Sequence, residues 1–190
     1  MRTHYCGELT SSNINQVVTI CGWVHYRRDF GGLIFLEIRD RSGLVQVVFN
    51  PENDKKLFTI AGKARKENVV AITGKVAARP NGTENSELTT GAIEIIANTL
   101  EIINECKQLP FYPDEHYTIS EEVRLKYRYL ELRRVEMLQK IQFRAKVTRA
   151  IRNFLDQHGF LDIETPMLTK ATPEGARDYL VPSRTYPGKF

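Results

Sequence analysis

The chain has 190 residues, of which 42% are hydrophobic and 26% charged, a composition that excludes a disordered chain and permits one or two small domains. No apolar run approaches the ~20 residues that cross a bilayer, and the N-terminus lacks the apolar region of a signal peptide. We therefore expect a cytoplasmic protein without a membrane partner. The formal net charge of +4 permits a polyanionic partner but does not require one.

The three cysteines and four histidines are scattered along the chain. No Cys-x-x-Cys pair occurs, and no neighbouring histidine pattern of the kind that zinc sites use accompanies the cysteines. We expect reduced thiols at Cys6, Cys21 and Cys106 and no metal site.

Residues 1–103 alternate between apolar and polar side chains as β-strands do, with one helical interval. The expected strands span residues 17–28, 33–41, 44–49, 68–79 and 92–103, and the expected helix spans residues 51–67. Three strands, a helix and two strands is the order of the OB-fold, a small β-barrel, although other small barrels share part of it. An OB-fold by itself does not fix function.

Residues 105–119 have the features of a linker, because they contain Pro110 and Pro113 and show no periodicity. We therefore predict a barrel domain at residues 1–104 and a mainly helical region at residues 120–190. Its longest helix is expected from about residue 135 to residue 158, followed by Gly159. Two apolar stripes run along this helix, so a partner chain or further sequence is needed to cover it.

The strand at residues 33–41 places Phe35 on the same face as Glu37 and Arg39. Such a ring is either partly covered surface or a platform for an RNA base, a contact worth ~1–3 kcal/mol. The other groups predicted on this barrel surface or within reach of it are Arg27, Arg28, Asp29, Gln46, Lys75, Arg79 and Glu94. A ring, an amide, a carboxylate and arginines on one surface suit the recognition of unpaired bases.

Residues 124–134 contain five basic side chains within eleven positions. A solvated helix face with internal ion pairs would explain this segment. Contact with a phosphate backbone is the alternative, and its salt dependence would reveal it.

Several segments resemble the aspartyl-tRNA synthetase family. Residues 21–24 (Cys-Gly-Trp-Val), 27–29 (Arg-Arg-Asp), 34–35 and 39–41 resemble its anticodon-binding domain, and residues 124–134 resemble the segment that leads into its catalytic domain. Residues 160–168 (Phe-Leu-Asp-Ile-Glu-Thr-Pro-Met-Leu) resemble motif 1 of the class II synthetases. Residues 172–178 (Thr-Pro-Glu-Gly-Ala-Arg-Asp) and 179–184 resemble the aspartate-site loop and the strand after it, the most specific match of all.

The resemblance implies an OB-fold of five strands plus one helix, a linker, and the mainly helical start of a class II synthetase α+β catalytic domain. In such enzymes Phe35 would stack on an anticodon base, with Arg28, Gln46, Arg79 and Glu94 also at the anticodon. Three further residues would bear on tRNA specificity: Phe30, Gly31 and Gly82. Pro166 would lie at a dimer interface, and Glu174 would meet the α-ammonium of aspartate. Without the resemblance, residues 173–175 fit a solvent-exposed turn.

The resemblance also implies ATP-dependent aspartylation of tRNA(Asp) by a full-length homodimer that binds ATP, Mg²⁺ and L-aspartate. The sequence ends at Phe190, before the family's ATP-binding motifs 2 and 3. We therefore expect no bound cofactor, no catalytic residue within residues 1–190 and no catalysis by this chain alone. ATP–pyrophosphate exchange by the purified chain would contradict that expectation.

Several alternatives stay open at this point. The loop at residues 80–83 lacks the charged residues of stricter family members, which leaves open whether tRNA(Asn) is charged as well. A freestanding OB-fold RNA-binding protein would explain residues 1–103 but not residues 160–184. A non-catalytic paralogue that uses motif 1 only to dimerise is a further alternative. The residues around Glu174 disfavour an asparaginyl or lysyl synthetase.

Overall fold

The structure, a computed structural model, describes residues 1–114, 118–168 and 179–190. They form two compact units, Met1–Pro110 and Phe111–Phe190. The boundary between the units falls within the linker predicted for residues 105–119.

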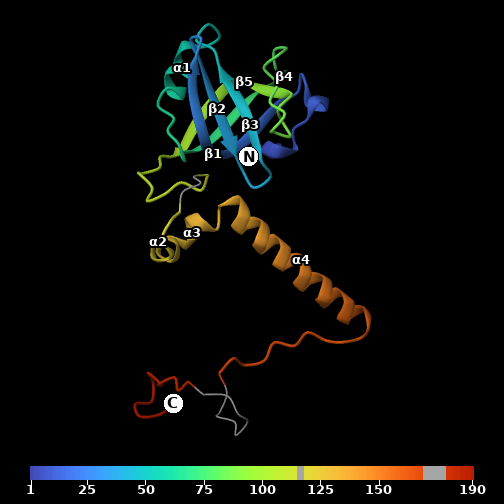
Figure 1. Cartoon of the computed structure of the whole chain (residues 1–190), viewed down its shortest axis with the longest axis vertical. Helices are drawn as coiled ribbons and strands as arrows, with labels where there is room; N and C mark the ends of the chain where they lie inside the picture. Colours follow the sequence, from blue (N-terminus) through green and yellow to red (C-terminus); the bar gives the residue numbers. More distant parts are fainter. Residues whose placement is uncertain (115–117, 169–178) are drawn as a thin grey trace. The chain divides into compact units, whose positions relative to one another are not determined.

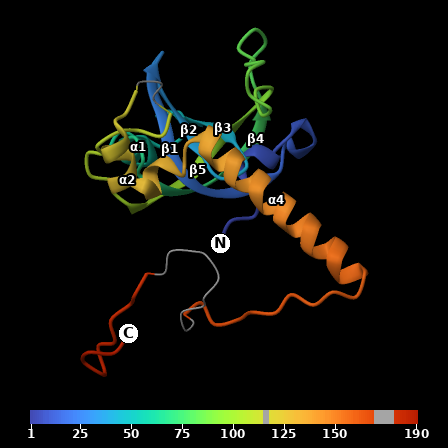
Figure 2. The ribbon, with the colours of Figure 1, turned by 60° about the horizontal axis from the view of Figure 1, so that its bottom comes forward.

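The first unit is a closed five-stranded barrel in which the strands are ordered β1-β2-β3-β5-β4 (Figure 1). The strands are β1 (Val17–Phe30), β2 (Leu33–Arg39), β3 (Leu44–Phe49), β4 (Val69–Ala78) and β5 (Ile93–Asn104). Helix α1 (Lys55–Ala61) lies between β3 and β4 in the chain. Figure 2 shows the strands of this barrel from a second direction. The predicted OB-fold of five strands plus one helix is confirmed.

Helix α1 is shorter than the predicted helix at residues 51–67. Asp54 begins it, because its carboxylate accepts hydrogen bonds from the backbone N–H groups of Lys56 (2.7 Å) and Leu57 (3.0 Å). Turns follow Gly62, and Glu67 adopts a φ of 66°, which no helix accommodates. The helical spacing in the sequence thus extended past both ends of the real helix.

The β1–β2 hairpin determines which side chains lie on the outer surface of the barrel. Its turn uses Gly31 (φ 59°) and Gly32 (φ 78°), the left-handed conformations that a tight two-residue hairpin turn requires. A β-bulge shifts the register between Val24, which lies opposite Ile38, and Tyr26, which lies opposite Glu37. Because of this extra residue, Tyr26 and Arg28 share the face of Glu37 and Phe35.

The barrel interior is apolar and follows the predicted alternation. On β2, Ile34, Leu36 and Ile38 are buried, whereas Phe35 and Glu37 are only half-buried. Two short 3₁₀ helices, Cys6–Glu8 and Ser11–Asn13, precede β1, and Cys6 and Leu9 join the same core. The sequence contained no helical periodicity by which these short helices could be predicted.

The second unit contains α2 (Glu121–Lys126), α3 (Arg128–Glu131) and α4 (Val135–Gln157). Ser120 is the predicted N-cap of α2, and its Oγ accepts a 3.5 Å hydrogen bond from the backbone N–H of Val123. Gly159 (φ 82°) follows the end of α4. No residue of α4 is buried, and apolar side chains such as Phe143 (70% exposed) stay open to solvent.

Within the described residues, no helix is long and apolar enough to cross a membrane. All three cysteines have free thiols.

Candidate nucleic-acid interface

Arg28 and Phe35 form the centre of the candidate interface on the outer face of the barrel. They lie opposite each other in the β1–β2 pair, and the Arg28 Cζ atom lies 5.0 Å from the Phe35 ring centroid. Arg28 is exposed and Phe35 is half-buried. The guanidinium thus holds the ring in place by a cation–π contact, while part of the ring stays accessible. An aromatic ring with a free portion and an adjacent cation can hold a stacked base beside a phosphate or a carbonyl oxygen.

Gln46 and Glu94 extend this face onto β3 and β5. Gln46 lies opposite Glu37 of β2, and its Nε2 donates a 2.9 Å hydrogen bond to Oε2 of Glu94. Both side chains are buried, with 6% and 7% of their surface exposed. The predicted amide and carboxylate are therefore brought together, but the amide already has one partner. Within the part of the chain that the structure describes, Oε1 of Glu94 accepts no hydrogen bond and can receive one from a base amino group.

Arg79 was predicted on the exposed surface of the barrel, but its side chain is buried. It follows the last residue of β4 and is 8% exposed. Its Nε donates to the carbonyl of Ile93 (3.0 Å), and its Nη1 donates to the carbonyl of Thr83 (3.4 Å). Burial lowers the pKa of this guanidinium from its ordinary value, and the carboxylates of Glu94 and Glu37 oppose that shift.

Arg79 therefore ties the loop after β4 to the start of β5 beside Glu94. Its Nη2 is buried and has no hydrogen-bond partner. An unpaired buried donor of this kind is costly in the free protein. It becomes satisfied if a bound group brings an acceptor to it.

The three residues predicted to bear on specificity lie at the β1–β2 hairpin and in the loop after β4. Phe30, at the end of β1, is 72% exposed. Gly31 and Gly82 (φ 81°) both have positive φ angles, and a Cβ added at either position would meet no atom within 4 Å. The backbone N–H of Gly82 donates a 2.8 Å hydrogen bond to the Glu84 carboxylate.

Tyr26 is a further aromatic side chain on this face that the sequence reasoning missed. It is 55% exposed and lies opposite Glu37, next to the Arg28–Phe35 pair along the hairpin. Uninterrupted alternation from Val18 would have placed both Tyr26 and Arg28 inside the barrel. The β-bulge turns them outward and directs Arg27 the other way, where it donates to the carbonyl of Gly62 and pairs with Asp29 (2.6 Å).

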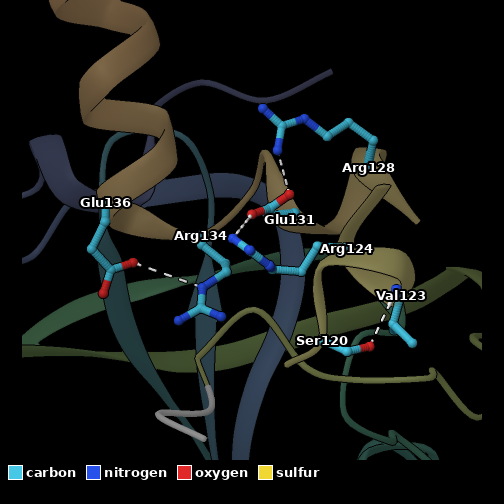
Figure 3. Close-up of polar contacts among 7 residues, drawn as sticks. All are labelled: Ser120, Val123, Arg124, Arg128, Glu131, Arg134 and Glu136. Carbon is cyan, nitrogen blue, oxygen red and sulfur yellow. Dashed lines mark hydrogen bonds and ion pairs between the residues drawn. The ribbon is translucent and has the colours of Figure 1, made fainter. Parts of the chain in front are cut away.

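Several basic side chains of residues 124–134 form ion pairs with nearby glutamates (Figure 3). Glu131 is 1% exposed and accepts hydrogen bonds from Arg128 and, at 3.1 Å, from Nη1 of Arg124. Arg134 lies 3.9 Å from Glu136. Ion pairs within this region therefore account for three of the five basic side chains, Arg124, Arg128 and Arg134, as the simpler interpretation of this segment predicted.

The two remaining predicted site residues lie in the second unit. Pro166 is exposed in a segment without regular structure. The start of that segment is linked to α4 by a 2.8 Å ion pair between Arg152 and Asp162. Glu174 lies outside the described residues.

Comparison with known proteins places both units in one class. Residues 18–103 match the model of the OB-fold nucleic acid binding domain, and residues 120–190 match the model of the class II tRNA synthetases (D, K and N). Among solved structures, the asparaginyl-tRNA synthetase of Pyrococcus horikoshii complexed with asparaginyl-adenylate is similar, with a TM-score of 0.78 and 28% identity. The similarity covers 90% of this chain and 38% of that one. A putative aspartyl-tRNA synthetase from Leishmania major Friedlin shares the fold, with a TM-score of 0.80, 23% identity, and coverage of 94% and 37%. An OB-fold barrel followed by this helical region defines a class II tRNA synthetase.

The curated relatives identify the particular family within this class. The aspartate–tRNA(Asp/Asn) ligases of Legionella pneumophila strains Corby and Philadelphia 1 are each 57% identical to the chain over all 190 residues. Within its class, the chain therefore belongs to the bacterial-type aspartyl-tRNA synthetase family. It spans about a third (32%) of the length of these relatives. The match at residues 120–190 excludes a freestanding OB-fold protein.

Proposed function

We propose that the barrel of this chain is the domain of an aspartate–tRNA ligase that binds the anticodon of tRNA(Asp). The observation that supports this most is the continuous outer face on which Arg28 and Phe35 adjoin the Gln46–Glu94 pair. Phe35 stacks on one anticodon base, Arg28 neutralises nearby negative charge, and Oε1 of Glu94 accepts from a base edge. Arg79 acts on the anticodon through the loop at residues 80–83, which it holds by its hydrogen bond to the Thr83 carbonyl.

Substitution of Phe35 tests this proposal. Phe35→Ala removes the stacking surface and should weaken binding of the tRNA(Asp) anticodon stem-loop by ~1–3 kcal/mol, about 5- to 150-fold. The matched control is Phe160→Ala, which removes a ring that is 63% exposed in the second unit. Equal affinities of the two variants in a fluorescence titration would show that Phe35 is a partly covered surface ring that does not stack on a base.

The activity of the longer protein is a proposal of the same kind. It would join L-aspartate to tRNA with ATP and Mg²⁺ in the cytoplasm, with Glu174 at the substrate ammonium and Pro166 at the interface of a homodimer. Within the described residues, no group of three or more His, Cys, Asp or Glu side chains could hold a metal ion.

We further propose that the full-length enzyme charges tRNA(Asn) as well as tRNA(Asp). The Legionella relatives are named for both tRNAs, and the loop is open at Gly82, where an added Cβ would meet no atom within 4 Å. Comparison of the charging rates of the two tRNAs by the full-length enzyme tests this. A rate for tRNA(Asn) at the background level would contradict it.

A further inference from the structure

Two arginines from distant parts of the chain converge on one tyrosine at the N-terminal end of the barrel. The Cζ atoms of Arg2 and Arg41 lie 4.5 Å and 4.4 Å from the Tyr5 ring centroid. Arg41 belongs to the connection between β2 and β3, and both arginines are exposed. Because both lie within 4.5 Å of one centroid, the two guanidinium carbons are less than 9 Å apart.

This pair of cations has no counter-charge in the part of the chain that the structure describes: neither arginine forms an ion pair or a side-chain hydrogen bond there. The carboxylate beside Arg41 in the sequence, Asp40, accepts instead from the backbone N–H of Cys6 and from Ser42, all within 2.8 Å. A guanidinium that stacks on a ring keeps its N–H edge free, and each arginine has five N–H donors. The two side chains therefore present unpaired donors and unbalanced positive charge at one place.

Anchoring of the N-terminal segment does not require this arrangement. Thr3 already exchanges hydrogen bonds with Thr19, since its N–H donates to the Thr19 carbonyl and its Oγ1 accepts from the Thr19 N–H, both at 2.8 Å. The N–H of Gly7 donates a 2.8 Å hydrogen bond to Ser42 Oγ. These contacts fix the segment on either side of Tyr5. The two neighbouring positive charges are therefore not needed to hold it on the barrel.

We propose that Arg2 and Arg41, held by Tyr5, form a binding site for a backbone phosphate of the RNA whose anticodon lies on the Phe35 face. One phosphate can accept hydrogen bonds from both guanidinium groups. Their carbons are less than 9 Å apart, and each N–H···O bond spans ~3 Å from nitrogen to oxygen. β2 ends at Arg39, four positions and roughly 13 Å along the strand from Phe35, and Arg41 follows two positions later in the connection to β3. The site therefore contacts the RNA at a nucleotide other than the stacked one. This inference rests on the proposed anticodon-binding function.

The test is a titration of the 190-residue chain with the tRNA(Asp) anticodon stem-loop over a series of salt concentrations. The variant is Arg2→Gln/Arg41→Gln, and the charge-matched control is Lys63→Gln/Arg65→Gln, which removes two exposed cations beyond α1. The arginine variant should bind on the order of tenfold more weakly at low salt. The slope of log affinity against log salt should become shallower by ~0.7–0.9, the contribution of one phosphate contact. The control should keep the slope of the unmodified chain.

Two outcomes would overturn the phosphate site: an affinity of the arginine variant equal to that of the control, or an unchanged salt slope. If the double variant melts at a lower temperature, the single variant Arg2→Gln decides instead, because Arg2 is exposed beside the end of the chain. Its slope must become shallower for the proposal to stand. Failure of the underlying function is distinguishable, since Phe35→Ala would then also leave the affinity unchanged.

Discussion

The hydrogen bond between Gln46 and Glu94 gives the sharpest test of the structure on which the interface depends. Gln46→Glu replaces the donating amide with a carboxylate of the same size, 2.9 Å from the Glu94 oxygen, in a place where both side chains are more than 90% buried. Two ionised carboxylates cannot both remain there without large repulsion. We therefore expect the variant to be destabilised at neutral pH and to recover as the pH falls.

The magnitude follows from two limits. Repulsion between unit charges ~4 Å apart, with an effective dielectric constant of ~20, costs about 4 kcal/mol. The alternative is to protonate one carboxyl, which from an ordinary pKa of ~4.3 costs about 4 kcal/mol at pH 7 and about 1 kcal/mol at pH 5. A carboxyl whose pKa is raised in the folded state contributes stability at low pH and loses it as the pH rises through that pKa. The variant should thus lose about 3–4 kcal/mol at pH 7 but only about 1 kcal/mol at pH 5.

Urea unfolding of the chain, followed by circular dichroism at both pH values, measures these losses. Gln16→Glu, which adds the same charge at an exposed position, is the matched control and should change the free energy of unfolding by less than about 0.5 kcal/mol. The double variant Gln46→Glu/Glu94→Gln reverses the pair and should recover most of the lost stability. A loss that is the same at both pH values, or a reversed pair as unstable as the single variant, would refute this account of the contact.

Three further predictions concern the rest of the molecule. Burial tends to raise the pKa of Asp40, but hydrogen bonds from Ser42 and Cys6 hold it below its ordinary value. Asp40→Asn should therefore cost about 1–2 kcal/mol in urea unfolding at pH 7, and less as the pH falls below ~4. Glu131→Gln weakens the ion pairs with Arg124 and Arg128, and the amides of α2 and α3 should exchange with deuterium roughly tenfold faster. Burial, with Asp40 nearby, raises the pKa of the Cys6 thiol, so a thiol reagent at pH 8 should label only Cys21 and Cys106 rapidly until urea unfolds the barrel; fast labelling of Cys6 would contradict its burial.

Much of the barrel was predictable because its strands are half-buried. Apolar alternation identified the inward side chains of β2 at Ile34, Leu36 and Ile38, and the order of elements predicted the OB-fold. Alternation failed at the bulge beside Val24, because an inserted residue reverses the faces without any change in composition. The outward position of Tyr26 was for that reason outside the reach of the sequence pattern.

The details of the candidate interface depend on contacts between distant residues. Gln46 and Glu94 meet because β3 and β5 run side by side in parallel, a pairing that closes the barrel and leaves no local signal in the sequence. The burial of Arg79 and its bond to the Thr83 carbonyl likewise follow from the path of the loop after β4. The sequence could name these residues as polar members of one surface, but not their partners.

The most direct test of anticodon binding compares two RNAs on the unmodified chain. One is the tRNA(Asp) anticodon stem-loop, and the other has the same stem with all three anticodon bases replaced. Because stacked and edge-read bases contribute ~1–3 kcal/mol each, the chain should bind the first RNA at least about tenfold more tightly at the same salt concentration. Equal affinities would show that the barrel holds RNA only through its phosphates, which would contradict recognition of the anticodon by the Phe35 face.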